Sequence, residues 1–180
     1  MASPGPANAV SDWFSAFANF LYDPSRGLKS NFNRLAAQRG WRRKSKKIRW
    51  TECQTICFAA LYGGDADKNK LEKWQDLCRE VRIAEPPKSI SGCKQALGCR
   101  QVLVNLVNLI DHRSIGVPVI RFKNYPAFQA YTTNGCIYPR EEAKKEGFIK
   151  ALLRFQSMQE DDKLPVLLVA LKGQQQFGRR

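Results

Sequence analysis

Apolar side chains recur at helical spacing along most of this sequence, and this periodicity limits the possible fold more than any other feature. The clearest case is the order i, i+3, i+4, i+7 at Leu103, Leu106, Val107 and Ile110. No two segments show the paired alternation of apolar and polar residues that is typical of a β-hairpin. The pattern therefore predicts a compact, mostly α, multi-helix domain, with short strands at most, at 117–122 and 166–171.

Proline and glycine residues divide this periodicity into separate helices. We expect the first helix to run from Ser11 to a break at Pro24, the second to end at Gly40 and the third to end at Gly63. The last helix is predicted to begin at Pro139. The apolar faces of the predicted helices lie at Trp13, Phe14, Phe17 and Phe20; at Leu28, Phe32, Leu35 and Ala36; at Trp50, Cys53, Cys57 and Leu61; at Leu71, Trp74, Cys78 and Val81; and at Phe148, Ala151, Leu152 and Phe155.

Short polar side chains stand where several of these helices are expected to begin. Ser25 or Ser30 is a candidate N-cap for the second helix, and Asp67 is one for the fourth. Ser89 or Ser91 is a candidate for a short helix that continues to Leu97. The 180 residues are therefore interpreted as a flexible leader (1–10), a single helical domain (11–157) and a tail (158–180).

Two aromatic ladders share one plan. In each, aromatic residues at spacing i, i+3, i+6 precede a proline-marked break and an amphipathic helix. The ladders begin at Phe14 and at Phe122. This echo leaves two interpretations open: two related helical sub-modules, or aromatic residues that simply belong to the core.

One segment carries a dense positive charge. Residues 39–49 hold seven arginines and lysines and no acid, in a chain whose net charge is +14. Such a run attracts an anion or a receptor, so it predicts nuclear import and contact with the phosphates of DNA or RNA. The residues predicted to serve these roles are Arg42, Arg43, Lys44, Lys46, Lys47 and Arg49. Trp41 and Trp50 either stack on unpaired bases or anchor the flanking helices.

No pattern in the sequence indicates catalysis. Cys53 and Cys57 have loose zinc-ligand spacing, but the remaining cysteines supply no matching pair, and His112 is the only histidine. We therefore predict no enzyme activity, no catalytic residue, no metal and no cofactor. The first residues do not resemble a secretory signal, and no apolar stretch is long enough to span a bilayer. We expect reduced thiols, a nuclear location and no membrane partner.

Four segments of the sequence resemble a family of filamentous ascomycete fungi. They are DWF and YDP at 12–14 and 22–24, FNRLAAQRGW at 32–41, LEKWQDLC at 71–78, and EAKKEGFIKALL at 142–153. This poorly characterised family includes a subtelomeric, hypoxia-responsive regulator of colony and biofilm morphology. The resemblance implies a regulatory role in the nucleus, and it supplies no binding residues.

The sequence thus predicts a non-enzymatic, basic nuclear protein that influences gene expression and contacts nucleic acid through its basic run. The alternative is a protein-interaction adaptor whose basic run serves only an import receptor or an acidic protein partner. In that case the aromatic ladders and the apolar residues 164–171 are the candidate contact surfaces.

Overall fold

The computed structural model describes residues 6–63, 70–139 and 148–152, and it is mostly helical, as the sequence predicts. The described residues contain no β-strand. The helices are α1 (Pro6–Ser15), α2 (Leu28–Gln38), α3 (Arg43–Tyr62), α4 (Lys70–Glu80), α5 (Ile90–Leu97), α6 (Leu106–Ile115) and α7 (Tyr125–Thr133). Residues 148–152 are also helical.

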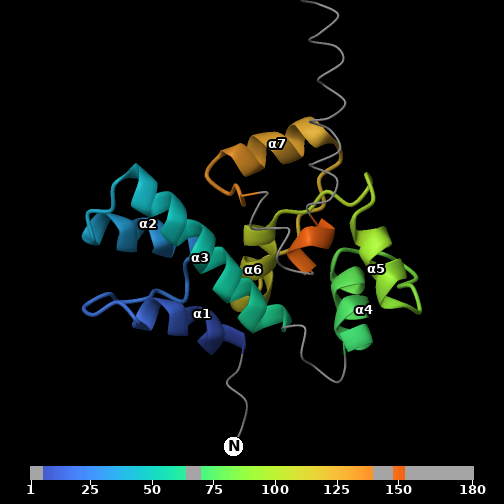
Figure 1. Cartoon of the computed structure of the whole chain (residues 1–180), viewed down its shortest axis with the longest axis horizontal. Coiled ribbons are helices and arrows are strands. Elements are labelled where there is room, and N and C mark those ends of the chain that lie inside the picture. The colour runs from blue at the N-terminus through green and yellow to red at the C-terminus, as the bar shows by residue number, and fades with distance from the viewer. Residues whose placement is uncertain (1–5, 64–69, 140–147, 153–180) are drawn as a thin grey trace, which may run out of the picture.

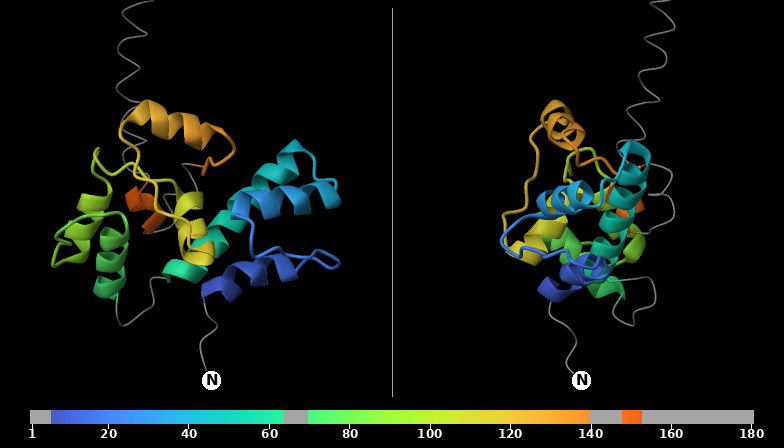
Figure 2. Two further views of the ribbon diagram at one scale, coloured as in Figure 1. Left: turned by 180° about the vertical axis from the view of Figure 1, so that it is seen from behind. Right: turned by 90° about the vertical axis from the view of Figure 1, so that its left-hand side faces the viewer.

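Helix α6 is the centre of the packing. It contacts α1, α2 and α3 on one side of the molecule, and α4 and α5 pair with each other on the other side (Figure 1). Helix α7 lies across one end of this arrangement (Figure 2). One core of buried apolar side chains extends from Val10 to Leu152. A second, smaller cluster lies beside this core, and in it Phe128, the buried residue of α7, packs with Leu103.

The first helix differs from its predicted bounds at both ends. It begins at Pro6, so residues 6–10 are helical and are not part of a flexible leader, and Val10 is fully buried. It ends at Ser15, well before Pro24. Asn19 has a left-handed φ of 62°, and the chain then turns back so that Phe20 and Tyr22 pack on the ring of Phe14. Aromatic packing against α1 thus replaces continuation of the helix.

The amino end of α2 is capped from a distant part of the chain. Neither Ser25 nor Ser30 caps it, since Gly27 holds the N-cap position without a side chain. The Leu28 N–H instead donates to Oδ1 of Asp111, on α6, at 2.7 Å. A Cβ added at Gly27 would lie 2.7 Å from Oδ2 of Asp111, so glycine lets the carboxylate approach without a shift. The contact fixes α2 against α6.

Asp111→Ala is expected to reduce the free energy of unfolding by about 1–2 kcal/mol, because the Leu28 N–H loses its partner. Burial raises the pKa of the Asp111 carboxyl above 3.8, and the hydrogen bond from Leu28 opposes that rise. Between these two pKa values the folded chain holds a proton that the unfolded chain releases. The free energy of unfolding therefore falls as the pH rises from 3.8 toward the raised pKa. Urea unfolding measured against pH checks both points. Asp111→Asn keeps an acceptor for the Leu28 N–H but cannot ionise, so its free energy of unfolding should rise relative to that of the wild type toward neutral pH. Equal free energies of unfolding for Asp111→Ala and Asp111→Asn would contradict the capping role.

The middle of the chain contains further departures from the sequence predictions. Helix α6 begins at Leu106, because the side chain of Asn105 accepts from the Val107 N–H and caps it. Residues 117–122 form no strand; one backbone hydrogen bond joins the Phe122 N–H to the Leu103 carbonyl, and no neighbouring strand continues that pairing among the described residues. By contrast, Ser89, one of the two predicted candidates, caps α5.

The two aromatic ladders adopt different structures. Tyr125, Phe128 and Tyr131 lie within α7, whereas Phe17 and Phe20 lie beyond the end of α1. In the first ladder Phe14 contacts Phe20, and in the second Phe122 contacts Phe128 and Tyr131. The interpretation that these aromatic residues belong to the core therefore fits better than the interpretation as two related sub-modules.

The last predicted helix is only partly described. Phe148, Ala151 and Leu152 are buried, as predicted for its inner face. The proposed cap Asp67, residues 140–147 and everything after Leu152 lie outside the described residues, and with them Phe155 and the strand predicted at 166–171. Of the helices that the structure describes, none combines the length and apolar character that a bilayer-spanning segment needs.

Candidate nucleic-acid interface

The basic run folds as the first turns of a helix. Helix α3 begins at Arg43, seven residues before Trp50, where the sequence placed the start of its apolar face. Lysine and arginine are good helix formers, and the buried residues that follow, Cys53 and Gln54 among them, attach the helix to the core. The run is therefore a helix face with a defined geometry and not a loop between two helices.

A tight reversal places α3 beside α2. Gly40 has a φ of 60°, which favours glycine, and Trp41 N–H donates to the Ala36 carbonyl at 3.0 Å while Gly40 N–H donates to Ala37. These paired bonds are the Schellman arrangement that ends a helix. The prediction that the second helix ends at Gly40 is confirmed to within one residue, since Arg39 is its C-cap.

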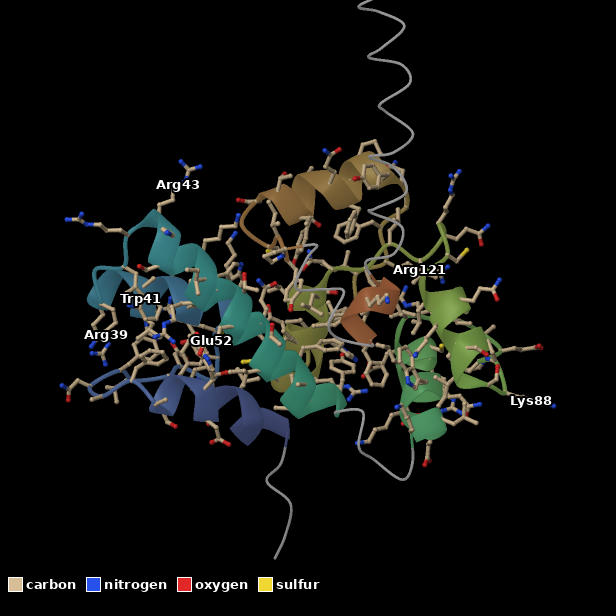
Figure 3. All side chains as sticks on the ribbon, in the orientation of Figure 1. Arg39, Trp41, Arg43, Glu52, Lys88 and Arg121 are labelled. Carbon is tan, nitrogen blue, oxygen red and sulfur yellow. The ribbon has the colours of Figure 1, made fainter. Side chains whose placement is uncertain are left out.

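The helical geometry divides the cations between two faces. Arg43, Lys46, Lys47 and Trp50 follow the spacing i, i+3, i+4, i+7, so their side chains leave one side of α3. Lys44 belongs to the adjacent face. Figure 3 shows Arg43 pointing into solvent at the amino end of the helix.

Two cations of the run are engaged within the protein. The Arg39 guanidinium donates to the Ala18 carbonyl at 2.6 Å and lies over the ring of Phe17. Arg49 forms an ion pair with Glu52 at 2.8 Å. Arg39 thus holds the loop after α1. Of the predicted binding residues, Arg49 alone forms an ion pair with an acid in the described part of the chain.

The other five cations have exposed side chains and, within the described residues, no hydrogen bond or ion pair. They are Arg42, Arg43, Lys44, Lys46 and Lys47. The first turn of α3 contains no acid, and the side chain of its N-cap, Arg42, makes no capping hydrogen bond. Positive side chains at the positive end of a helix dipole are destabilising by about 0.3–1 kcal/mol each, whereas an anion there is stabilised. The arrangement favours anion binding over stability of the isolated helix.

The face that carries Arg43, Lys46 and Lys47 borders a pocket of about 290 Å³. Its lining is Lys29, Phe32, Asn33, Arg43, Lys46, Lys47, Trp50 and Gly135. Four of these side chains are cationic, and two are aromatic. The Phe32 and Trp50 rings contact each other with a centroid separation of 4.7 Å. The pocket thus combines positive charge with an aromatic surface.

Lys29, the pocket residue that comes from α2 and carries a charge, is held in place by the turn after α7. Its ammonium donates to the Asn134 carbonyl. Gly135 has a φ of 78°, and a Cβ at that position would lie 3.0 Å from Cε of Lys29. The glycine turn after α7 therefore lets Lys29 approach closely, and three separate parts of the chain build the pocket.

Both tryptophans of the run contact the core. The Trp41 ring lies 5.5 Å from Phe17 and 5.8 Å from Phe32, and Trp50 also packs on Phe32. These contacts support the interpretation that the tryptophans anchor the flanking helices. Both remain partly exposed, and Trp50 lines the pocket while Trp41 does not. Of the two, Trp50 is placed for contact with a bound base.

The thiols are mostly buried. Five of the six cysteines lie in the interior, and Cys99 is exposed. Burial raises the pKa of Cys78 to about 12, and the neighbouring Cys93 adds to the rise. Burial likewise raises the pKa of Cys53 and of Cys136. Thiols with raised pKa values are poor nucleophiles at neutral pH.

The single histidine, His112, contacts the backbone. Nδ1 of His112 lies 2.7 Å from the Val117 carbonyl, so the ring interacts with the backbone near the end of α6. Within the ranges that the structure describes, no three side chains of the metal-binding types gather closely enough to hold a metal ion.

A thiol reagent added to the native protein is expected to modify one cysteine quickly, because only Cys99 is exposed. The other five should react only after unfolding. Absorbance titration with a disulfide reagent, before and after denaturant, measures both phases. Cys99→Ser should remove the fast phase; a fast phase that survives this substitution would contradict the described burial.

Sequence reasoning identified the cations of the run but not the other pocket residues. Lys29, Phe32, Asn33 and Gly135 come from α2 and from the turn after α7, and no local pattern connects them to α3. Comparison with known proteins adds no relatives: no family model, no curated protein and no solved structure matches this chain.

Proposed function

We propose that this chain is a non-enzymatic, basic nuclear protein that influences gene expression and holds nucleic acid at the amino end of α3. The observation that carries the proposal is the pocket in which Lys29, Arg43, Lys46 and Lys47 surround the rings of Phe32 and Trp50. The cations suit backbone phosphates, and an aromatic surface suits the face of a base.

This combination favours an unpaired strand over a duplex. A duplex offers phosphates to the cations, but its bases are stacked inside and cannot reach Trp50. A single strand can place a phosphate near Arg43 and a base on the indole ring at the same time. The role in gene expression rests on the exposed basic run and on the fungal family that the sequence resembles.

Fluorescence anisotropy tests the proposal. The probes are a labelled oligothymidine of about 12 nucleotides, which spans one typical single-strand site, and a duplex of the same length. We expect binding of both at low salt, with the single strand bound more tightly. Inorganic polyphosphate, which has charge but no bases, should compete less well than unlabelled oligothymidine. Absence of binding to either probe at low salt would remove the proposal.

A second candidate function is nuclear import alone. It is favoured by the exposure of every cation from Arg42 to Lys47, which leaves the run accessible to an import receptor. Imaging of a tagged protein with Arg42, Arg43, Lys46 and Lys47 replaced by alanine separates the two functions. If the run serves import only, a foreign import signal restores activity to this variant; if the run also holds nucleic acid, the relocated variant stays defective.

A further inference from the structure

The outer face of α3 carries apolar side chains that the described core does not use. Ile48 is 59% exposed and Ile56 is 44% exposed, although α3 buries Cys53, Cys57 and Leu61 on its inner face. The two isoleucines lie eight residues apart, so they are on the same side of the helix and about 12 Å apart along its axis. A helix with apolar residues on opposite sides is one that packs against two surfaces.

These isoleucines lie in a groove of about 670 Å³. Its lining is Lys44, Lys47, Ile48, Thr51, Glu52, Thr55, Ile56 and Pro139. Gln54 donates to the Ile137 carbonyl at 3.2 Å, and the Thr55 and Tyr138 hydroxyls lie 2.7 Å apart. These two contacts hold the segment that ends at Pro139 along the edge of the groove.

The polar groups of the groove are already engaged within the protein, with two exceptions. Thr51 donates to the Lys47 carbonyl and Thr55 to the Thr51 carbonyl, so both threonines have satisfied hydroxyls. Glu52 pairs with Arg49. Only Lys44 and Lys47, both at one end, have no such partner among the described residues. The groove therefore fits an occupant that is apolar along its length and acidic at one end.

The chain itself contains such a segment. After Leu152, the last described residue, the sequence continues for 28 residues and includes three consecutive acids followed, one residue later, by an apolar octad. The acids are Glu160, Asp161 and Asp162, and the octad is 164–171. The order of acids and then apolar residues matches the order of Lys44, Lys47 and then Ile48 to Ile56 along α3.

The connecting length is sufficient. Glu160 lies eight positions after Leu152, and eight extended steps of the chain span about 26 Å. A domain of this size has a radius of gyration of about 15 Å. Residues 148–152 lie in the middle of the molecule, between α6 and the α4–α5 pair (Figure 1). The acidic end of the segment can therefore reach a neighbouring face.

We propose that residues 160–171 occupy the groove on the outer face of α3, with the three acids at Lys44 and Lys47 and the apolar octad over Ile48 and Ile56. This docking removes the apolar side chains of the groove and those of the octad from water together. It also places three negative charges beside the cations at the amino end of α3. Since Lys47 lines both the groove and the smaller basic pocket, the docked segment competes with an anion bound there.

Photo-crosslinking of the full-length protein tests this placement without any nucleic acid. Benzoylphenylalanine replaces Ile48, an exposed position that tolerates a ring, and in a control protein it replaces Lys88. Lys88 is exposed and lies at the far end of the molecule from α3 (Figure 3). After irradiation at low protein concentration, peptide mass spectrometry identifies the crosslinked residues.

We expect crosslinks from position 48 to residues 160–171 in chains of monomer mass, and none to that segment from position 88. Replacing the acids by Glu160→Gln, Asp161→Asn and Asp162→Asn should reduce the crosslink yield several-fold. Crosslinks from position 48 only to another copy of the chain would assign the groove to a dimer and overturn the proposal. Crosslinks only to other parts of the same chain, or none, would overturn it as well.

Discussion

The variant with Arg43, Lys46 and Lys47 replaced by alanine is expected to bind oligothymidine about 100-fold more weakly than the wild type at low salt. Each cation near a phosphate releases a counterion when it binds, and the three side chains form one face of α3 beside the Phe32–Trp50 surface. The same variant should be more stable by about 0.3–1 kcal/mol, because Arg43 leaves the first turn of α3, at the positive end of the helix dipole. Anisotropy and thermal unfolding measure the two effects.

Because the affinity should fall while the stability rises, the experiment distinguishes loss of a binding surface from misfolding. Loss of binding through misfolding would lower the unfolding temperature, whereas loss of a binding surface should raise it. The matched control replaces Lys88, Lys123 and Lys150, which are exposed and do not line the pocket, and removes the same net charge. Equal loss of affinity in both variants would mean that overall charge, and not the face of α3, drives binding.

Trp74→Ala is expected to reduce the free energy of unfolding by about 3–5 kcal/mol, a large part of the stability of a domain of this size. Trp74 is fully buried, and its ring stacks on Phe148 with a centroid separation of 3.8 Å. On another side, the ammonium of Lys94 lies 5.2 Å from the ring centre. The substitution removes the contact that joins α4 to residues 148–152. The midpoint of urea unfolding measures the loss.

Trp74→Phe provides the control for this prediction. The Nε1 of Trp74 is buried and has no hydrogen-bond partner among the described residues, so phenylalanine keeps much of the apolar contact and removes that donor. We expect a loss of less than about 1.5 kcal/mol. If alanine and phenylalanine had the same small effect, the stacked arrangement with Phe148 would not describe the core.

Helix content could be predicted from the sequence because apolar periodicity is local. Two buried positions of α4, Trp74 and Cys78, follow directly from it, and so does Val81, which is buried just beyond the end of that helix. Helix ends were harder to predict where distant residues decide them. Asp111 caps α2 from α6, and Phe20 returns to pack on Phe14, so no local pattern specifies either end.

The candidate site shows the same division. Charge density alone identified Arg43, Lys46 and Lys47, but not that they share one helix face, because the apolar periodicity of α3 begins only at Trp50. Lys29 joins them only because Gly40 reverses the chain and Gly135 permits a close approach. Convergence of this kind depends on tertiary packing, which the order of residues does not reveal.

The salt dependence of binding to oligothymidine tests the central claim most directly. With four cations around the pocket, the logarithm of the binding constant should fall against the logarithm of salt concentration with a slope of about −3. The variant with alanine at positions 43, 46 and 47 should give a slope shallower by about 2, while the charge-matched control variant keeps that of the wild type. The same slope for the wild type and the alanine variant would contradict the placement of nucleic acid at the amino end of α3.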